Sequence, residues 1–381
     1  MAKYKLGDIC EIVSGSTPKT SIEEYWDGDI KWITPAEIND NTYIVTDSVR
    51  KLTKLGVQKT GLSPFPEGTV ILSSRAPIGK VAIAGCEMYC NQGFKNLICS
   101  DKILNKYLYW FLKGNTAFLN SLGRGATFRE ISKSIVSEIE INVPDIAHQQ
   151  KAVDTLEKVS IAIFLRKQEM SALDDLIKAR FVEMFGDVQH EEKYKGIQLG
   201  ELCTTMSGGT PSTKFPEYYE GDIPWISTVS LGPNYIDGTT AKGYITQEAV
   251  DNSATKLIPA GNILFGTRVG VGKSSLNNVD ICTNQDIVAI VGIDESKFNR
   301  LFIKHVLDAY QSYYDSIKKG ATILGITGDD LKDTLIPNAP IEIQIEFEKF
   351  VNQVDKSKVA VQKALDETQL LFNSLMQKYF G

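Results

Sequence analysis

Residues 6–33 read LGDICEIVSGSTPKTSIEEYWDGDIKWI, and residues 199–226 read LGELCTTMSGGTPSTKFPEYYEGDIPWI. The two segments align without a gap at an offset of 193, with 15 identities in 28 positions. Unrelated segments of average composition would share about two identities. A period near 194 residues is too long for a solenoid repeat. It indicates a duplicated domain, and such copies often pack around a pseudo-two-fold axis.

The correspondence continues along both copies of the duplicated domain. At the offset of 193 the matching residues are Arg75 with Arg268, Gly79-Lys80 with Gly272-Lys273, and Asn91-Gln92 with Asn284-Gln285. Further on the offset becomes 195, and the matching residues are Gly125-Ala126-Thr127 with Gly320-Ala321-Thr322, and Phe185-Gly186 with Phe380-Gly381. The second copy therefore repeats the order of the first.

Each copy begins with a globular part of about 140 residues that is rich in turn residues. Short apolar runs at 69–72 and 262–265 lie between Gly and Pro residues, as strands do. Residues 104–112 and 301–307 are typical of helices. The sequence therefore predicts two mixed α+β domains in tandem.

Each copy closes with a long helix that carries one apolar seam. In 4-3 steps from Ala152 and from Phe347, eight of ten positions are apolar in each copy, which is a heptad pattern. Each helix could fold back onto its own globular part, but matched seams at matched positions favour mutual pairing. The predicted seam residues are Leu156, Val159, Ile163, Met170, Leu173, Ile177, Val351, Val354, Val361, Leu365, Phe372 and Leu375.

These patterns divide the chain into four parts. The first globular domain takes residues 1–146 and the first long helix 147–190. The second domain takes 191–341 and the second long helix 342–381. Two helices of about 35–40 residues that pair would act as a spacer between the two domains.

Composition excludes several classes of protein. No run of about 18 apolar residues and no signal-peptide core exists, so we expect no membrane span and a cytoplasmic protein. The six cysteines show neither a disulfide framework nor zinc-ligand spacing. Residues 1–145 hold 17 basic and 16 acidic residues, and residues 191–340 hold 13 and 18. A nucleic-acid site would therefore have to consist of local basic patches.

Motifs for catalysis are weak. Gly272-Lys273-Ser274 resembles the end of a P-loop, but the required first glycine falls on Thr267, and copy one has Gly79-Lys80-Val81. The histidines at 148, 190 and 305 are far apart. We therefore expect a protein without catalysis, metal or cofactor of its own. The rival interpretation is a nuclease or NTPase that uses Lys273.

Other residues suit DNA recognition, because Arg and Lys match guanine and phosphate while Asn and Gln match adenine edges. The loop 123–129 is basic and aromatic, whereas its mate at 320–325 lacks the two arginines, so the two domains should read different sequences. Turn scaffolding for the Asn-Gln pairs and ion pairing for the two matched arginines are the alternatives. The candidate DNA-binding residues are Arg75, Lys80, Asn91, Gln92, Arg124, Thr127, Arg129, Arg268, Lys273, Asn284, Gln285, Lys318, Lys319 and Thr322, while Trp32 and Trp225 are expected in the core.

The ordered set of motifs resembles the specificity subunit of type I restriction–modification systems. In copy one the motifs are Leu6-Gly7-Asp8, Gly15-Ser16-Thr17-Pro18, Trp32-Ile33, Gly68 to Arg75, Gly125-Ala126-Thr127, Asn142-Val143-Pro144, His148-Gln149-Gln150 and Phe181 to Asp187. Copy two repeats the order from Leu199 to Gly381, but the helix start reads Ile343-Gln344-Ile345. This departure affects the residues with which the second long helix would dock.

The resemblance implies that each globular part is a target-recognition domain and that the helices form an antiparallel coiled coil. It implies double-stranded DNA and two methyltransferase subunits as partners, with a restriction subunit as an optional further one. S-adenosylmethionine would bind to the methyltransferase, and ATP and Mg²⁺ to the restriction subunit. Two unlike readers on one spacer predict a bipartite, asymmetric target with an unread gap. The alternative function is a coiled-coil adaptor that binds protein and has no DNA specificity.

Overall fold

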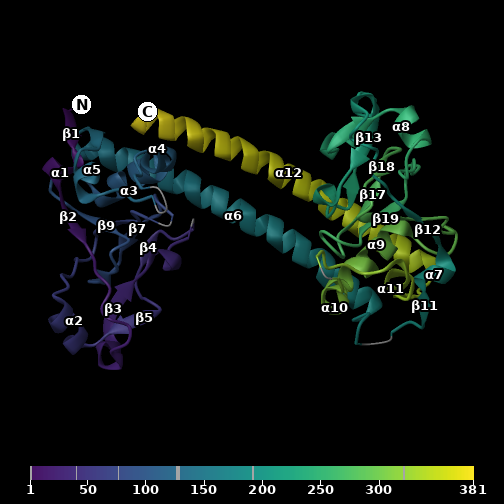
Figure 1. Ribbon diagram of the computed structural model, residues 1–381, viewed down its shortest axis with the longest axis horizontal. Coiled ribbons are helices and arrows are strands. Elements are labelled where there is room, and N and C mark those ends of the chain that lie inside the picture. The colour runs from purple at the N-terminus through teal and green to yellow at the C-terminus, as the bar shows by residue number, and fades with distance from the viewer. Residues whose placement is uncertain (1, 40, 76, 126–128, 191–192, 321) are drawn as a thin grey trace. The chain divides into compact units, whose positions relative to one another are not determined.

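The computed structural model describes residues 2–39, 41–75, 77–125, 129–190, 193–320 and 322–381. The chain forms two compact units (Figure 1). Unit 1 comprises Met1–Gln168 and Gln362–Gly381, and unit 2 comprises Glu169–Val361. Each unit therefore holds the globular part of one copy, the start of the helix that follows it, and the end of the other copy's helix. Both units mix helices with sheets, so the predicted tandem of α+β domains is confirmed.

Unit 1 contains a mixed five-stranded sheet with the order β2-β9-β6-β7-β4, a three-stranded sheet β5-β3-β8, and the pair β1-β10. Strands β4 and β7 run parallel, as do β3 and β8. The strands are β1 (Ala2–Lys5), β2 (Cys10–Ser14), β3 (Trp26–Ile33), β4 (Ile44–Val45), β5 (Arg50–Leu52), β6 (Val70–Leu72), β7 (Val81–Ala84), β8 (Tyr89–Cys90), β9 (Lys95–Cys99) and β10 (Glu140–Val143).

Unit 2 repeats this topology strand for strand, with sheets β12-β19-β16-β17-β14, β15-β13-β18 and β11-β20. The duplication seen in the sequence is therefore a duplication of the fold. The strands are β11 (Gly196–Gln198), β12 (Thr204–Ser207), β13 (Ile223–Ile226), β14 (Tyr235–Ile236), β15 (Gly243–Ile245), β16 (Ile263–Gly266), β17 (Ser274–Asn277), β18 (Cys282–Thr283), β19 (Ile287–Val291) and β20 (Leu335–Pro337).

The helices correspond as well. Unit 1 has α1 (Leu6–Ile9), α2 (Lys54–Thr60), α3 (Asn105–Gly114), α4 (Thr116–Ser121) and α5 (Lys133–Ser137). Unit 2 has α7 (Leu199–Leu202), α8 (Gln247–Asp251), α9 (Arg300–Ala309), α10 (Gln311–Ile317) and α11 (Gly328–Lys332). The long helices are α6 (Ile146–Phe185) and α12 (Ile341–Phe380), each of 40 residues. In the described part of the chain, no helix is long and apolar enough to cross a lipid bilayer.

The main core of each unit lies between its five-stranded sheet and the long helices. In unit 1, α3 is buried along most of its length and packs against Val70 and Leu72 of the sheet and against Leu156 of α6. In unit 2, α9 is buried in the same way against β16 and against Val351 of α12. Each globular part is therefore fastened to the first turns of its own long helix.

The end of the other copy's helix completes each core. In unit 2, Phe181 and Phe185 at the end of α6 contact Phe302 of α9, with Phe185 and Phe302 centroids 4.5 Å apart. In unit 1, Phe380 at the end of α12 lies 5.0 Å from the ring of Tyr107 on α3. Burying one such side chain contributes roughly 1.5–3 kcal/mol. These last turns are therefore part of the domain cores.

The two long helices run antiparallel in both units. In unit 1 the Arg166 guanidinium donates to the carbonyl oxygen of Ala364 at 2.7 Å. In unit 2, Lys358 and Asp174 form a 2.6 Å ion pair. The predicted mutual pairing is thus confirmed, although the first turns of each helix also pack on their own globular part. Of the predicted seam residues, Leu156, Ile163, Ile177, Val351 and Val354 are buried, while Val159, Met170, Leu173, Val361, Leu365, Phe372 and Leu375 are half-buried.

A buried glutamine sets the position of each long helix. The Gln149 amide donates to the carbonyl oxygens of Lys102 and Pro144 at 2.9 and 2.8 Å, and its oxygen accepts from the Leu104 amide at 2.8 Å. Both Gln149 and Gln344 are fully buried. Gln344 makes the equivalent three bonds, with the carbonyl oxygens of Lys297 and Ala339 and with the amide of Asn299. The departure of copy two at this point of the sequence therefore leaves the docking of its helix unchanged.

Replacing Gln149 with Ala should lower the free energy of unfolding by about 1–3 kcal/mol, because one amide and two carbonyl groups would lose their buried partner. Thermal or urea unfolding measures this change. Gln150 is the matched control, since its side chain is exposed and donates to Asp154 one turn along the same helix. Its replacement with Ala should change stability by less than about 0.5 kcal/mol. Equal effects of the two substitutions would contradict the anchoring role.

Candidate nucleic-acid interface

Three loops that are distant in sequence meet at one edge of unit 1. They are the β6–β7 turn (73–75 and 77–80), the segment before β9 (91–94) and the loop residues 123–125 and 129–131. Ser74 connects them, because its amide donates to the carbonyl oxygen of Gly93 at 2.7 Å and its carbonyl accepts from the Ile131 amide at 3.0 Å. We call this arrangement the loop frame.

Unit 2 contains the same loop frame. Thr267, which matches Ser74, donates from its amide to the carbonyl oxygen of Asp286 at 2.8 Å and accepts from the Ile326 amide at 2.8 Å. Gly79 and Gly272 occupy equivalent places in the turns, with φ of +92° and +86°. A side chain at either position would be strained in this left-handed conformation. The shared Gly-Lys motif thus marks a backbone turn that both units require.

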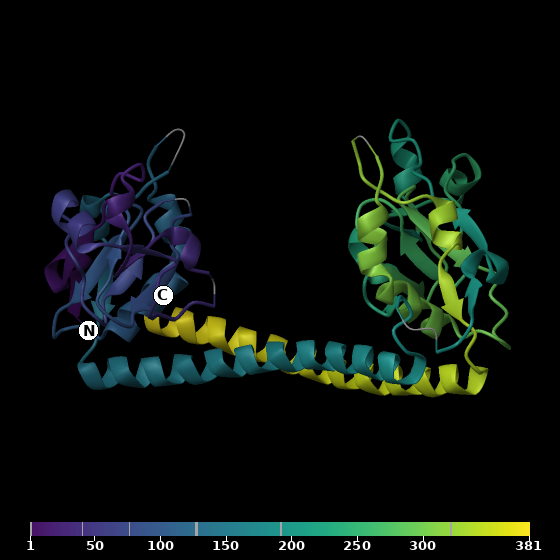
Figure 2. The same cartoon turned by 90° about the horizontal axis from the view of Figure 1, so that it is seen from below.

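A short hairpin rises from each loop frame. In unit 1 the backbones of Arg124 and Glu130 exchange two hydrogen bonds of 3.0 and 2.9 Å, and in unit 2 Lys319 and Gly325 do so at 2.8 and 2.9 Å. Figure 2 shows each hairpin on the side of its own unit that faces away from the long helices. Each hairpin is therefore placed to contact a ligand that the long helices leave uncovered.

The structure brings most of the predicted basic residues to these frames. In unit 1, Arg124 and Arg129 are exposed on the hairpin, and Arg75 is half-buried at its base. The Lys80 ammonium donates to the carbonyl oxygen of Pro35 at 2.9 Å and thereby ties the turn to the segment after β3. Thr127 lies outside the described residues.

The frame of unit 2 carries its predicted residues in equivalent places. Arg268, Lys273, Lys319 and Thr322 are exposed. Lys318 forms an ion pair with Asp315 in the preceding helix α10. The two frames therefore share a backbone but present different side chains.

The Asn-Gln pairs shape the segment before the central strand. The Asn91 oxygen accepts from the Gly93 amide at 2.8 Å, which is the turn-scaffolding role that is the alternative to DNA contact. The exposed Gln92 and Gln285 each accept a 2.5 Å hydrogen bond from a threonine, Thr17 and Thr210 respectively. These matched bonds orient both glutamines at the surface of their frames.

Each frame also holds an arginine beside a carboxylate. The Arg75 guanidinium lies 3.9 Å from the Glu130 carboxylate, whose other oxygen lies 3.1 Å from the ammonium of Lys95. Only 8% of the Lys95 side chain is exposed. In unit 2 the Arg268 guanidinium lies 3.6 Å from the Asp286 carboxylate. The two matched arginines therefore have acidic partners, as the alternative interpretation predicted.

Two further cations, each placed over a tryptophan ring, could not be predicted from the sequence. The Arg50 guanidinium lies 3.4 Å from the ring centroid of Trp26, and the Lys242 ammonium lies 5.6 Å from that of Trp225. Trp32 and Trp225 are buried, as expected of core residues. Such contacts hold a cation in place while leaving its other face open. The strand pairings β3–β5 and β13–β15 create them, and the spacing along the sequence gave no sign of them.

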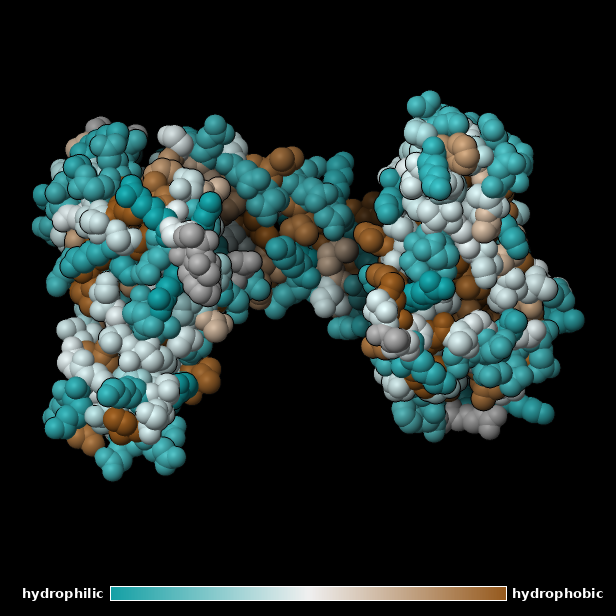
Figure 3. All heavy atoms as spheres, viewed as in Figure 1, coloured by the Kyte–Doolittle hydropathy of each residue, from teal (hydrophilic) through white to brown (hydrophobic). Residues whose placement is uncertain are grey.

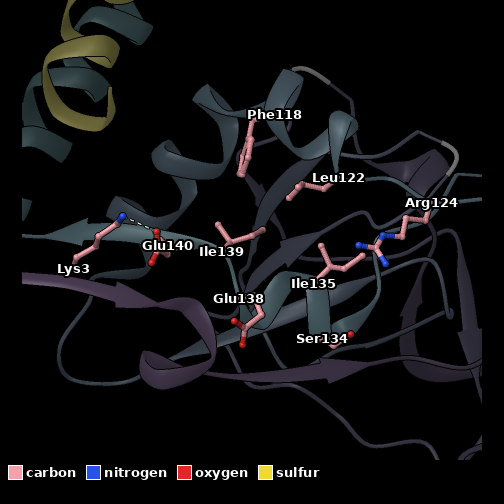
Figure 4. A pocket seen from close by; sticks show the side chains of 9 residues that line it. All are labelled: Lys3, Phe118, Leu122, Arg124, Ser134, Ile135, Glu138, Ile139 and Glu140. Atoms are coloured by element: carbon pink, nitrogen blue, oxygen red, sulfur yellow. Dashed lines mark ion pairs between the residues drawn. The ribbon is translucent and has the colours of Figure 1, made fainter.

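A hollow of about 620 Å³ lies beside the hairpin of unit 1 (Figure 4). Its floor is apolar, with Phe118, Leu122 and Ile135 directed into it, and Arg124 lines one side. At the far end Lys3 and Glu140 form a 2.6 Å ion pair. The hollow thus continues the surface of the hairpin with an apolar floor and a charged rim.

Gly272 and Ser274 of the apparent P-loop have structural roles. Ser274 is buried, and its hydroxyl donates to the Asp308 carboxylate at 2.7 Å. This bond anchors β17 to α9, so the hydroxyl that would have to reach Mg²⁺ is already engaged. Among the described residues, no group of three His, Cys, Asp or Glu side chains is placed to hold a metal ion.

The three histidines are separate in the fold. His148 and His190 are exposed, and each lies against an aspartate three residues before it. His305 is buried against Phe347, and this burial lowers its pKa well below the ordinary value. A buried neutral histidine of this kind belongs to the core of unit 2.

Comparison with known proteins gives a consistent result. The family model for the type I restriction modification DNA specificity domain matches residues 1–174 and 191–368. The MjaIX specificity subunit of Methanocaldococcus jannaschii is 30% identical over 96% of this chain and 90% of its own length. The EcoR124I/EcoR124II specificity subunit of Escherichia coli is also 30% identical, over 68% of this chain and 64% of its own.

Two solved structures show the same fold at low sequence identity. An S subunit from M. genitalium aligns over 100% of this chain and 96% of its own with a TM-score of 0.58 and 14% identity. A chain from a study of complex assembly in the type I R-M system aligns over 100% and 97% with a TM-score of 0.63 and 18% identity. The architecture of this chain is therefore that of S subunits.

The ion pair between Lys95 and Glu130 should give a measurable coupling in the free energy of unfolding. Replacing Glu130 with Ala removes the carboxylate partner of a buried ammonium, which still donates to the Ser74 hydroxyl 3.2 Å away, and should cost about 2 kcal/mol. Adding Lys95→Met removes that unpaired charge and should restore most of the loss. Urea unfolding of both single variants and the double variant gives the coupling energy. Additive effects in this cycle would show that the pair contributes nothing to the loop frame.

Proposed function

The chain belongs to the family of type I restriction modification DNA specificity domains, and from that membership we propose that it selects the DNA sequence for a type I restriction–modification complex. The observation that carries the proposal is the pair of loop frames. Both have the same backbone bonds, but Arg124 matches Lys319 and Glu130 matches Gly325. One scaffold with two sets of side chains suits a reader of two unlike half-sites.

In this proposal the chain performs no chemistry and serves as a subunit of the enzyme. A methyltransferase partner holds S-adenosylmethionine and modifies adenine, and a restriction partner, where one joins, uses ATP and Mg²⁺. The structural role of Ser274, whose hydroxyl is bonded to Asp308, supports this division of labour. The binding of the duplex would combine local cations of the frames with phosphate contacts from the partners.

The long helices are the proposed docking surface for two methyltransferase subunits. Apolar side chains lie among hydrophilic ones on the surface of these helices (Figure 3). Phe164 on α6 and Leu371 on α12 are half exposed in unit 1, and the equivalent Val359 and Leu176 are exposed in unit 2. Apolar side chains that are exposed on a protein surface commonly mark sites of contact with another protein. Two equivalent sets of them support two equivalent partners.

The function is tested by mapping methylated bases at single-base resolution in cells that carry this chain with its methyltransferase, and in matched cells that lack only this chain. We expect a gapped, asymmetric motif with methyladenine in each half, which disappears with the chain. Identical methylation in both cell lines would refute the proposal and would favour a protein-binding adaptor.

Docking is tested with Phe164→Glu and Val359→Glu. A buried unpaired carboxylate at a contact is strongly unfavourable, so each single variant should lower the number of bound methyltransferase subunits from two to one, and the double variant to none. Native mass spectrometry of the purified complex counts the subunits. Gln168→Glu, at an exposed polar position of the same helix, is the control and should retain two. Retention of both subunits by the double variant would place the docking surface elsewhere.

A further inference from the structure

We propose that Arg75 and Arg268 each read a guanine in one half-site, and that the carboxylates of Glu130 and Asp286 position them. The inference rests on the proposed function and names the residues that would decide sequence preference in it. Its basis is a pair of equivalent arginines, one in each loop frame, whose acidic partners occupy non-equivalent positions of the two frames.

The two arginines occupy the same place in their units. Each follows directly after the residue that connects the three loops, Ser74 or Thr267. The Arg75 side chain is 34% exposed and that of Arg268 is 51% exposed, so both retain an open face. An arginine whose guanidinium group has one acidic neighbour and an open face suits the two parallel hydrogen bonds that a guanine edge offers.

Each carboxylate is itself held by a second donor. One oxygen of Glu130 faces Lys95 at 3.1 Å while the other faces Arg75 at 3.9 Å. One oxygen of Asp286 accepts from the Asn284 amide at 3.0 Å while the other faces Arg268 at 3.6 Å. Both arginine contacts are long for an ion pair with direct hydrogen bonds. The carboxylates can therefore orient the guanidinium groups without using up their donors.

The position of the acid is exchanged between the two frames. Where unit 1 has Glu130, unit 2 has Gly325, and where unit 2 has Asp286, unit 1 has Gly93. The exchange is built into the backbone of unit 2, since a Cβ atom on Gly325 would lie 2.6 Å from the Thr267 carbonyl oxygen and 3.1 Å from Cγ of Arg268. The acidic partner of the arginine thus comes from the hairpin in unit 1 and from the segment before the central strand in unit 2.

This difference gives each frame its own reading geometry. A carboxylate from a different segment of the frame orients the guanidinium donors differently, and a bidentate contact tolerates little change in direction. Positions 93 and 130 in unit 1, and 286 and 325 in unit 2, are therefore the positions that set where each guanine falls in its half-site. The other half-site provides an internal control for every substitution.

The experiment is the methylation map of Arg75→Lys and Arg268→Lys, each expressed with the methyltransferase. Lysine keeps the charge for phosphate but lacks the fork that matches guanine. We expect Arg75→Lys to raise methylation at sites altered in one G·C pair of one half-site by about 10- to 100-fold, with the other half-site unchanged. Arg268→Lys should relax one G·C pair of the other half-site.

The carboxylates are tested in the same assay. Glu130→Gln and Asp286→Asn keep the shape but remove the charge, and each should relax the same base pair as the arginine it faces, by a smaller factor. A role only in stability would instead lower methylation at all sites together. Thermal unfolding of each variant confirms that it is folded.

Three results would overturn the inference. They are a wild-type half-site without a G·C pair, a base preference that ignores both arginine substitutions, and a uniform loss of methylation that indicates phosphate contact alone. A wild-type chain that directs no gapped motif would refute the proposed function and the inference together. An intact motif that is indifferent to the arginines would refute the inference alone.

Discussion

Burial of the last turns of each long helix on the globular part of the other copy is the constraint on which the rest of the structure depends. Phe181 and Phe185 of α6 lie against Phe302 in unit 2, and Phe380 of α12 lies against Tyr107 in unit 1. Aromatic side chains of this size dominate the energetics of a core. Each core is therefore completed by a helix that begins in the other copy, and this exchange requires the two helices to run antiparallel.

The buried glutamines fix the start of each long helix, and the aromatic last turns fix its end. Gln149 and Gln344 fix where each helix leaves its own globular part, through three hydrogen bonds each. The aromatic last turns fix where it ends. A buried amide without partners costs about as much free energy as several surface interactions contribute. Residues elsewhere on the helices can therefore change without moving the start or the end of either helix. In the proposed function, the exposed apolar positions of the helices remain available to the methyltransferase subunits.

The loop frames combine a shared backbone with different side chains. Their backbone bonds through Ser74 and Thr267 are the same in both units, whereas the side chains on the hairpins differ. Outside the positions that require glycine, such as Gly79 and Gly272, a frame that relies on backbone bonds tolerates new side chains at its surface. In the proposed function this would allow the two half-sites to change independently while the helices and their partners stay the same.

Much of this architecture could be predicted from the sequence, because repetition and periodicity are local signals. The 15 identities in 28 positions revealed the duplication, and the heptad pattern revealed the paired helices, since apolar residues at 3.5-residue spacing have to be buried along one stripe. The offset of 195 aligned Gln149 with Gln344, but only the structure showed that each is buried and makes the same three hydrogen bonds. The aromatic contacts of Arg50 and Lys242 also depend on strand pairing that no spacing reveals.

The sequence by itself determined the two-fold repetition and the long helices, and it supplied the candidate DNA-binding residues. Only the tertiary structure decided which residues meet. Glu130 and Asp286 reach equivalent arginines from different loops, 55 and 18 residues away along the chain. The physical reason is that ion pairs and hydrogen bonds act over a few ångströms in space, whereas the loops that bring these groups together are joined by backbone bonds between segments far apart in sequence.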